Sequence, residues 1–375
     1  MDLTFTPRQR AFRAEVREWL AAHVPADPLP SMDTAEGFER HRAWERTLAE
    51  ARLSAVSWPE EYGGRGAGLV EWLIFEEEYW AAGAPGRVSQ NGIFLLAPTL
   101  MAYGTDEQKR RHLPRMARAD DIWAQAWSEP EAGSDLAALR ATATRDPGGD
   151  GWRLNGQKTW SSRAAFADWC FGLFRTDPGS ERHRGLTYFM LPLDSEGVTV
   201  RPIAQLDGEH GFAEIFFDDV RVPDDGVLGG VGEGWRVAMA TTSSERGLTL
   251  RSPGRFMATA DRLLELASGS DDPALRDAAA QAWCDSDAYR LHTFHAAARI
   301  AEGAELGADS SLMKVFWSEL DLRMHELALD LLGPRAPLAG PWLDGFLFAL
   351  AGPIYAGTNE IQRNIIAERV LGLPR

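Results

Sequence analysis

The chain has 375 residues, which is long enough to need more than one packed core. Its composition, 45% hydrophobic, 25% charged and 10% aromatic, is typical of a globular protein. With 39 basic and 55 acidic residues the net charge is −16, which argues against nucleic acid or an anionic membrane as the main partner.

The first 120 residues predict a helical domain. Thr6 with Gln9, and later Thr105 with Gln108, form two capping boxes, in which a hydroxyl and an amide satisfy the first N–H groups of a helix. Apolar residues recur at helical spacing over 70–82. We therefore expect an N-terminal α-helical domain over residues 1–120.

From about residue 121 the pattern changes to short β-rich runs. These runs cover residues 122–127, 140–144, 169–175, 186–191, 198–201 and 213–217. Asn155-Gly156 predicts a hairpin turn between residues 151–154 and 157–160, because a type I′ turn needs two positive φ values. We expect residues 121–230 to form a β-barrel or β-sandwich domain.

Helical periodicity returns after residues 229–230 and lasts to the end of the chain. Asp272-Pro273 marks the start of one helix, and Gly333-Pro334 marks the end of another. Residues 231–375 are therefore expected to form a C-terminal helical domain. The fold class predicted for the whole chain is α+β.

Two segments of the β region could carry chemistry. Residues 124–136 read as a strand leading into a turn rich in hydroxyls, acids and glycine, which could bind a flat heterocycle or a pyrophosphate, or be an ordinary polar turn. Residues 158–162, Lys-Thr-Trp-Ser-Ser, place an aromatic and two hydroxyls at a strand end. The alternative for Trp160 is a half-buried ring that fills the β core.

These two segments, together with residues 103–109, 217–223 and 354–363, resemble the acyl-CoA dehydrogenase family in order and spacing. The resemblance covers nearly the whole chain. It implies a helical N-terminal domain, a central β domain and a C-terminal four-helix bundle. It also implies FAD as cofactor, and α,β-dehydrogenation of an acyl thioester in which a carboxylate takes the α-proton and flavin N5 accepts the β-hydride.

The resemblance also implies which residues meet the cofactor and the substrate. Ser128 and Ser162 would hydrogen-bond the isoalloxazine, and Trp160 would flank it. The full set implied to contact FAD is Gln125, Trp127, Ser128, Gly133, Ser134, Trp160, Ser162, Thr358 and Glu360. The set implied to contact the substrate is Ser134, Arg246, Ala356 and Gly357.

The position of the proton-abstracting base departs from the usual family pattern. Ala356 stands where most family members carry the catalytic glutamate, and a methyl group cannot remove a proton, although its backbone N–H can still hold the thioester oxygen. A minority of the family carries this glutamate in a Glu-Arg segment, which here is Glu245-Arg246. Read from the residues alone, the sequence favours a surface glutamate at Glu245, paired with a nearby arginine. By the resemblance we expect Glu245 to be the base, with its pKa raised by an apolar pocket, and Arg246 to orient the substrate.

Three readings of the activity remain open. The first is a dehydrogenase of an acyl-CoA or acyl-carrier-protein substrate, with electron-transfer flavoprotein or another acceptor. The second is a related flavin monooxygenase or oxidase. The third is a half-site subunit of a hetero-oligomer, because residues 268–273 and 334–337 depart from the family pattern. The protein is expected to be a homo- or hetero-oligomer, a dimer or tetramer.

Other features of the sequence give plainer expectations. No apolar run reaches about 18 residues and the start does not resemble a signal peptide, so we expect a cytosolic protein without a membrane span. Cys170 and Cys284 both lie in apolar contexts and are expected to be buried, reduced thiols. The eight histidines show no metal-ligand spacing, and the glycine-rich residues 229–234 do not follow a strand as a dinucleotide-binding loop would.

Overall fold

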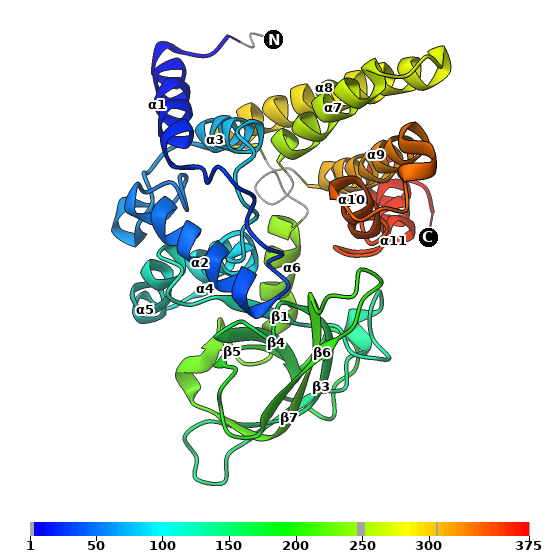
Figure 1. Cartoon of the computed structure of the whole chain (residues 1–375). Helices are drawn as coiled ribbons and strands as arrows, with labels where there is room; N and C mark the ends of the chain where they lie inside the picture. The colour runs from blue at the N-terminus through cyan, green and yellow to red at the C-terminus, as the bar shows by residue number, and fades with distance from the viewer. Residues whose placement is uncertain (1–3, 246–251, 305–306, 375) are drawn as a thin grey trace. The chain divides into compact units, whose positions relative to one another are not determined.

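The computed structural model describes residues 4–245, 252–304 and 307–374. The chain divides into two compact units. We call residues 1–26, 67–84 and 246–375 the helical unit, and residues 27–66 and 85–245 the sheet unit. The predicted boundaries near residues 120 and 230 stay a prediction, and each unit is described by itself (Figure 1).

The described part of the helical unit is built from α-helices. They are α1 (Pro7–His23), α3 (Leu69–Ala81), α7 (Pro253–Ser268), α8 (Pro273–Ala301), α9 (Asp309–Leu332), α10 (Pro341–Ala349) and α11 (Asn359–Ile365), with a 3-10 turn at Gly333–Arg335 and a π-helical turn at Ile366–Val370. Helices α7 and α8 run side by side and pack with α9 around the buried Phe256 and Trp317 (Figure 1). The predicted helix starts at Thr6 and Asp272 are confirmed, because both side chains accept backbone N–H groups of the first turn.

The sheet unit combines helices with one mixed sheet. Its helices are α2 (Ala35–Glu50), α4 (Ala97–Tyr103), α5 (Asp106–Ala117) and α6 (Gly234–Glu245), with 3-10 turns at Glu60–Tyr62, Leu136–Ala138 and Asp224–Gly226 and a π-helical turn at Asn91–Leu96. Its strands are β1 (Trp123–Ala126), β2 (Thr142–Arg145), β3 (Trp152–Ser162), β4 (Trp169–Arg175), β5 (Leu186–Pro192), β6 (Val198–Ile203), β7 (Phe212–Val222) and β8 (Val227–Leu228). The predicted capping box of Thr105 and Gln108 is confirmed at the start of α5.

The strands are hydrogen-bonded in the order β6-β7-β3-β2-β4-β5-β8, and β1 adds to β4 in parallel. They curve around an apolar core to which Leu154, Phe174 and Ile215 belong, each fully buried (Figure 1). Helices before, a sheet within, and helices after it confirm the predicted α+β class.

The hairpin predicted at Asn155-Gly156 is wrong, because β3 runs straight through both residues. Gly156 does take a positive φ of 141°, but it uses it in an irregularity of the β3–β7 pairing. A side chain at Gly156 would come within 2.6 Å of the Ala141 Cβ, so glycine also allows the close approach of the neighbouring chain. The turn that does join β2 to β3 lies at residues 146–151, where the Asp146 N–H donates to the Gly151 carbonyl.

The two thiols differ in environment. Cys170 is buried in the sheet core, and burial raises the pKa of its thiol. Cys284 on α8 is exposed, so the prediction of burial is wrong there. None of the described helices is long and apolar enough to cross a membrane.

Candidate functional site

The two chemistry-bearing segments of the β region lie together. The Thr159 N–H donates to the Ser128 carbonyl at 2.9 Å, which joins the turn after β1 to β3. We call residues 127–134 and 158–162, brought together in this way, the cradle. Strand β1 is held in place by its parallel pairing with β4, in which Gln125 lies opposite Phe171.

Trp160 is the most unusual residue of the cradle. Its side chain is 60% exposed, although tryptophan is among the largest apolar residues, and its φ of 58° lies in the left-handed region. The β3–β7 register shifts between Lys158 and Ser161, so the strand bulges where Trp160 sits. Its ring meets Phe212 edge to face at 6.0 Å. A strained, exposed aromatic residue of this kind indicates a functional site.

The other predicted cofactor contacts of the sheet unit differ in accessibility. Ser128 and Ser162 are half-buried, and Gly133 and Ser134 are exposed. A side-chain carbon added to Gly133 would meet no atom within 4 Å, so the space above this turn is open. Trp127, in contrast, is only 6% exposed.

The cradle contains a buried ion pair whose role the sequence reasoning missed. The Lys158 ammonium is fully buried and donates to Glu129 Oε1 at 2.8 Å and to the carbonyls of Trp127 and Leu173 at 3.3 and 2.7 Å. Burial lowers the pKa of Lys158, while the Glu129 carboxylate opposes that shift. The only hint in the sequence was a lysine and a glutamate flanking hydroxyls on expected strands.

The loop before α11 is held by a side chain of α11, Gln362, which is itself bonded to α9. Ala356 and Gly357 both take positive φ values, 56° and 79°. The Gln362 amide donates to their two carbonyls at 3.1 and 3.2 Å, and its own oxygen accepts the Ser311 hydroxyl at 2.7 Å. Because Gln362 is fully buried, these bonds fix the shape of the loop that contains Ala356.

The start of α11 is similarly anchored. Asn359 Oδ1 accepts the buried Lys314 ammonium at 2.6 Å and the Ser318 hydroxyl at 3.1 Å. Thr358 caps the helix by accepting the Ile361 N–H. The exposed Glu360 has a lowered pKa, first because its carboxylate accepts its own backbone N–H and then because the Thr358 hydroxyl donates to it. Sequence reasoning identified Thr358 and Glu360 but neither Lys314 nor Gln362.

Helix α6 leads to the predicted base. Thr241, in its middle, is fully buried and hydrogen-bonds the hydroxyls of Thr99 and Tyr188 at 2.8 and 3.3 Å. Glu245 is the last residue of α6. Its side chain, and all of Arg246, lie outside the described residues, so both assignments stay predictions.

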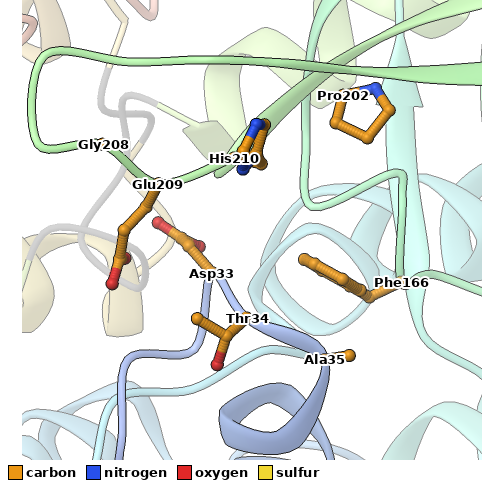
Figure 2. A pocket seen from close by; sticks show the side chains of 8 residues that line it. All are labelled: Asp33, Thr34, Ala35, Phe166, Pro202, Gly208, Glu209 and His210. Carbon is orange, nitrogen blue, oxygen red and sulfur yellow. The ribbon is translucent and has the colours of Figure 1, made fainter.

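A hollow of the sheet unit contains none of these residues. It has a volume of about 360 Å³ and is lined by Asp33, Thr34, Ala35, Phe166, Pro202, Gly208, Glu209 and His210 (Figure 2). Its two carboxylates are already engaged, Asp33 by Arg163 at 2.8 Å and Glu209 by the Ser31 hydroxyl. We therefore assign it no role in the chemistry.

The cradle suits a flavin by its own geometry. It offers an exposed aromatic ring at Trp160, accessible hydroxyls at Ser128 and Ser162, and open space above Gly133. Such hydroxyls can hydrogen-bond a flat heterocycle, and a turn of exposed backbone can approach a pyrophosphate. The residues present therefore fit FAD.

Comparison with known proteins gives one consistent result. Residues 6–120, 124–220 and 232–371 match, in this order, the families described as acyl-CoA dehydrogenase N-terminal, middle and C-terminal domain. The chain is 44% identical to acyl-CoA dehydrogenase IpdE1 of Mycobacterium tuberculosis, over 97% of both chains. Among solved structures, it superposes on the Tcur3481-Tcur3483 steroid ACAD with a TM-score of 0.89, at 28% identity and complete coverage of both chains. For the ChsE4-ChsE5 complex from Mycobacterium tuberculosis the TM-score is 0.84, at 32% identity and again complete coverage.

Proposed function

The chain belongs to the acyl-CoA dehydrogenase family, and from this premise we propose that Glu245 is the base that removes the α-proton of its acyl thioester substrate. Membership confirms the enzyme class, an oxidoreductase acting on a CH–CH bond of an acyl-CoA, and FAD as the cofactor. When bound, FAD supplies the hydride acceptor for the β-hydrogen.

One observation carries the assignment of Glu245. The loop that contains Ala356 is firmly held by the buried Gln362, yet Ala356 offers only a methyl group where most family members place the base. A dehydrogenase of this family still needs a carboxylate at the α-carbon. Glu245, in the Glu-Arg segment that ends α6, is the residue that the family resemblance offers in its place.

Residues of this chain bind the flavin and hold the thioester oxygen of the substrate. Ser128 and Ser162 hydrogen-bond the flavin ring, and Trp160 covers it. The set proposed to contact the rest of FAD is Gln125, Trp127, Gly133, Ser134, Thr358 and Glu360. The Ala356 N–H donates to the thioester oxygen, where it stabilises the negative charge that develops as the α-proton leaves.

For the substrate we place a steroid-derived CoA thioester first. The support is that the superposed Tcur3481-Tcur3483 protein is named a steroid ACAD. Ser134, Arg246 and Gly357 complete the proposed substrate contacts. An acyl carrier protein in place of CoA is the alternative carrier, and the two are separated by offering the same acyl group on each.

We further propose that the chain works in a hetero-oligomer with a second chain of the family and passes its electrons to an electron-transferring flavoprotein. The ChsE4-ChsE5 structure is described as a complex, and the name of the Tcur3481-Tcur3483 steroid ACAD also joins two proteins, which supports such a pairing. Native mass spectrometry of the protein purified from its own host, with the masses of both chains resolved, tests it. A homotetramer with full activity would refute it.

The base is tested by Glu245→Gln under anaerobic conditions. A steroid-derived acyl-CoA should bleach the flavin of the unaltered protein, and loss of the base should slow this reduction by a factor of about 10²–10⁴ while FAD stays bound. The matched control is Glu233→Gln, directly before the same helix, where Glu233 forms an ion pair with the exposed Arg236. The control should reduce at the unaltered rate.

Near-normal reduction by Glu245→Gln would refute the assignment. If no acyl-CoA reduces the unaltered flavin but reduced flavin and oxygen form a hydroperoxide, the monooxygenase or oxidase reading replaces ours. The relative IpdE1 is named as an acyl-CoA dehydrogenase, which does not favour that reading.

A further inference from the structure

The proposed function gives no role to the buried ion pair between Lys158 and Glu129 in the cradle. Lys158 has three N–H donors, and all three find oxygen acceptors within 3.3 Å. Glu129 accepts Lys158 and also the backbone N–H groups of Arg140 and Ala141, at 2.6 and 2.9 Å. A buried network with every member satisfied holds one geometry, because any displacement leaves a charge unpaired in a medium of low dielectric constant.

The position of this network links both halves of the cradle. Glu129 directly follows Ser128 in the chain, and Lys158 stands two residues before Trp160. The ammonium also binds the Trp127 carbonyl, on the other side of Ser128. Ser128 is thus tethered from both of its neighbours.

The strained backbone at Trp160 also indicates that Lys158 helps to fix the geometry of the cradle. A left-handed backbone costs an L-residue free energy, so it persists only where the surroundings over-determine it. Lys158 lies at one end of the irregular segment of β3, and the Thr159 N–H bond to the Ser128 carbonyl lies within it. Fixing Lys158 therefore fixes the point from which the chain bulges and turns Trp160 outward.

We propose that Lys158, through its ion pair with Glu129, is a positioning residue that sets the relation of Ser128 to Trp160 and so tunes FAD binding. This proposal rests on the FAD site of the proposed function, but not on the identity of the base or the substrate. The pair acts through Ser128 and Trp160.

The test replaces the pair by neutral side chains of similar size, Lys158→Met with Glu129→Gln, so that no lone charge stays buried. The matched control is Arg87→Met with Glu45→Gln, because Arg87 and Glu45 form another buried pair of the sheet unit, with side chains 4% and 0% exposed, and bind no cradle residue. FAD affinity is measured by titrating the FAD-free full-length protein, with its partner chain where one copurifies. The absorption spectrum and midpoint potential of the bound flavin are recorded as well.

The cradle variant should bind FAD at least tenfold more weakly and shift the flavin absorption bands, while the control should stay within threefold and keep the spectrum. Equal effects of both double variants, or an unchanged spectrum and affinity in the cradle variant, would overturn the proposal. If the cradle variant does not fold, Glu129→Asp is used instead, because it retains the charge but withdraws the carboxylate by one methylene. Unaltered FAD affinity and an unaltered flavin spectrum in Glu129→Asp would then refute the positioning role of the ion pair. Since no substrate is added, an inactive but flavin-loaded protein would count against the proposed function and leave this test intact.

Discussion

A buried histidine of the sheet unit should make stability depend on pH. His112 on α5 is 4% exposed and meets the rings of Trp123 and Trp169 edge to face at 5.4 and 5.1 Å. Burial lowers its pKa from 6.5 to about 4, assisted by the neighbouring Arg111 and by Arg115, and opposed by the carboxylates of Asp121 and Asp225.

The sign follows from which state binds the proton. The unfolded chain protonates this histidine below about pH 6.5, whereas the folded chain resists protonation until about pH 4. The contribution of the neutral His112 ring to the free energy of unfolding is therefore fully present above about pH 6.5 and is lost as the pH falls toward about 4. At about 1.4 kcal/mol for each pKa unit, the loss across this window is about 3 kcal/mol.

The assay is urea unfolding followed by circular dichroism at intervals from pH 7.5 to pH 4. His112→Leu lacks the titrating ring, so the stability difference between it and the unaltered protein should change by about 3 kcal/mol over this range. The control is His292→Leu, which removes an exposed histidine of α8 and shows how loss of a surface histidine changes the pH dependence of the free energy of unfolding. A difference between unaltered protein and His112→Leu that stays constant with pH would refute the reasoning.

Two further substitutions test features that hold the two units in shape. Gly156→Ala places a carbon 2.6 Å from the Ala141 side chain at a positive φ, so it should destabilise the protein by about 2–4 kcal/mol in urea unfolding. The control Gly148→Ala, in the open turn before β3, should change stability little. Equal effects of the two substitutions would contradict the packing argument. Gln362→Leu leaves the carbonyls of Ala356 and Gly357 without their donor, so it should lower the free energy of unfolding by about 1–3 kcal/mol and slow flavin reduction with FAD still bound. The control Gln281→Leu, on the exposed face of α8, should do neither. Unchanged flavin reduction in Gln362→Leu would show that the loop keeps its shape without the amide.

Local patterns in the sequence predicted the elements well where the deciding contacts are themselves local. Capping at Thr6, Thr105 and Asp272 depends on residues within three positions, and each prediction is confirmed. The Asn155-Gly156 pair shows the limit of this reasoning. Its demand for a positive φ was read correctly at Gly156, but a bulge inside a paired strand satisfies that demand as well as a hairpin turn does.

The fold and the family were determined by the sequence, because motif order along the chain suffices to recognise them. The buried contacts of the cradle and of the loop that contains Ala356 were not. Lys158 meets Glu129 across 29 positions and the Leu173 carbonyl across 15, and Gln362 meets Ser311 across 51. Only the strand pairing and helix packing of the folded chain bring such groups within hydrogen-bond distance, because a charge or an amide is buried only where its distant partners arrive with it.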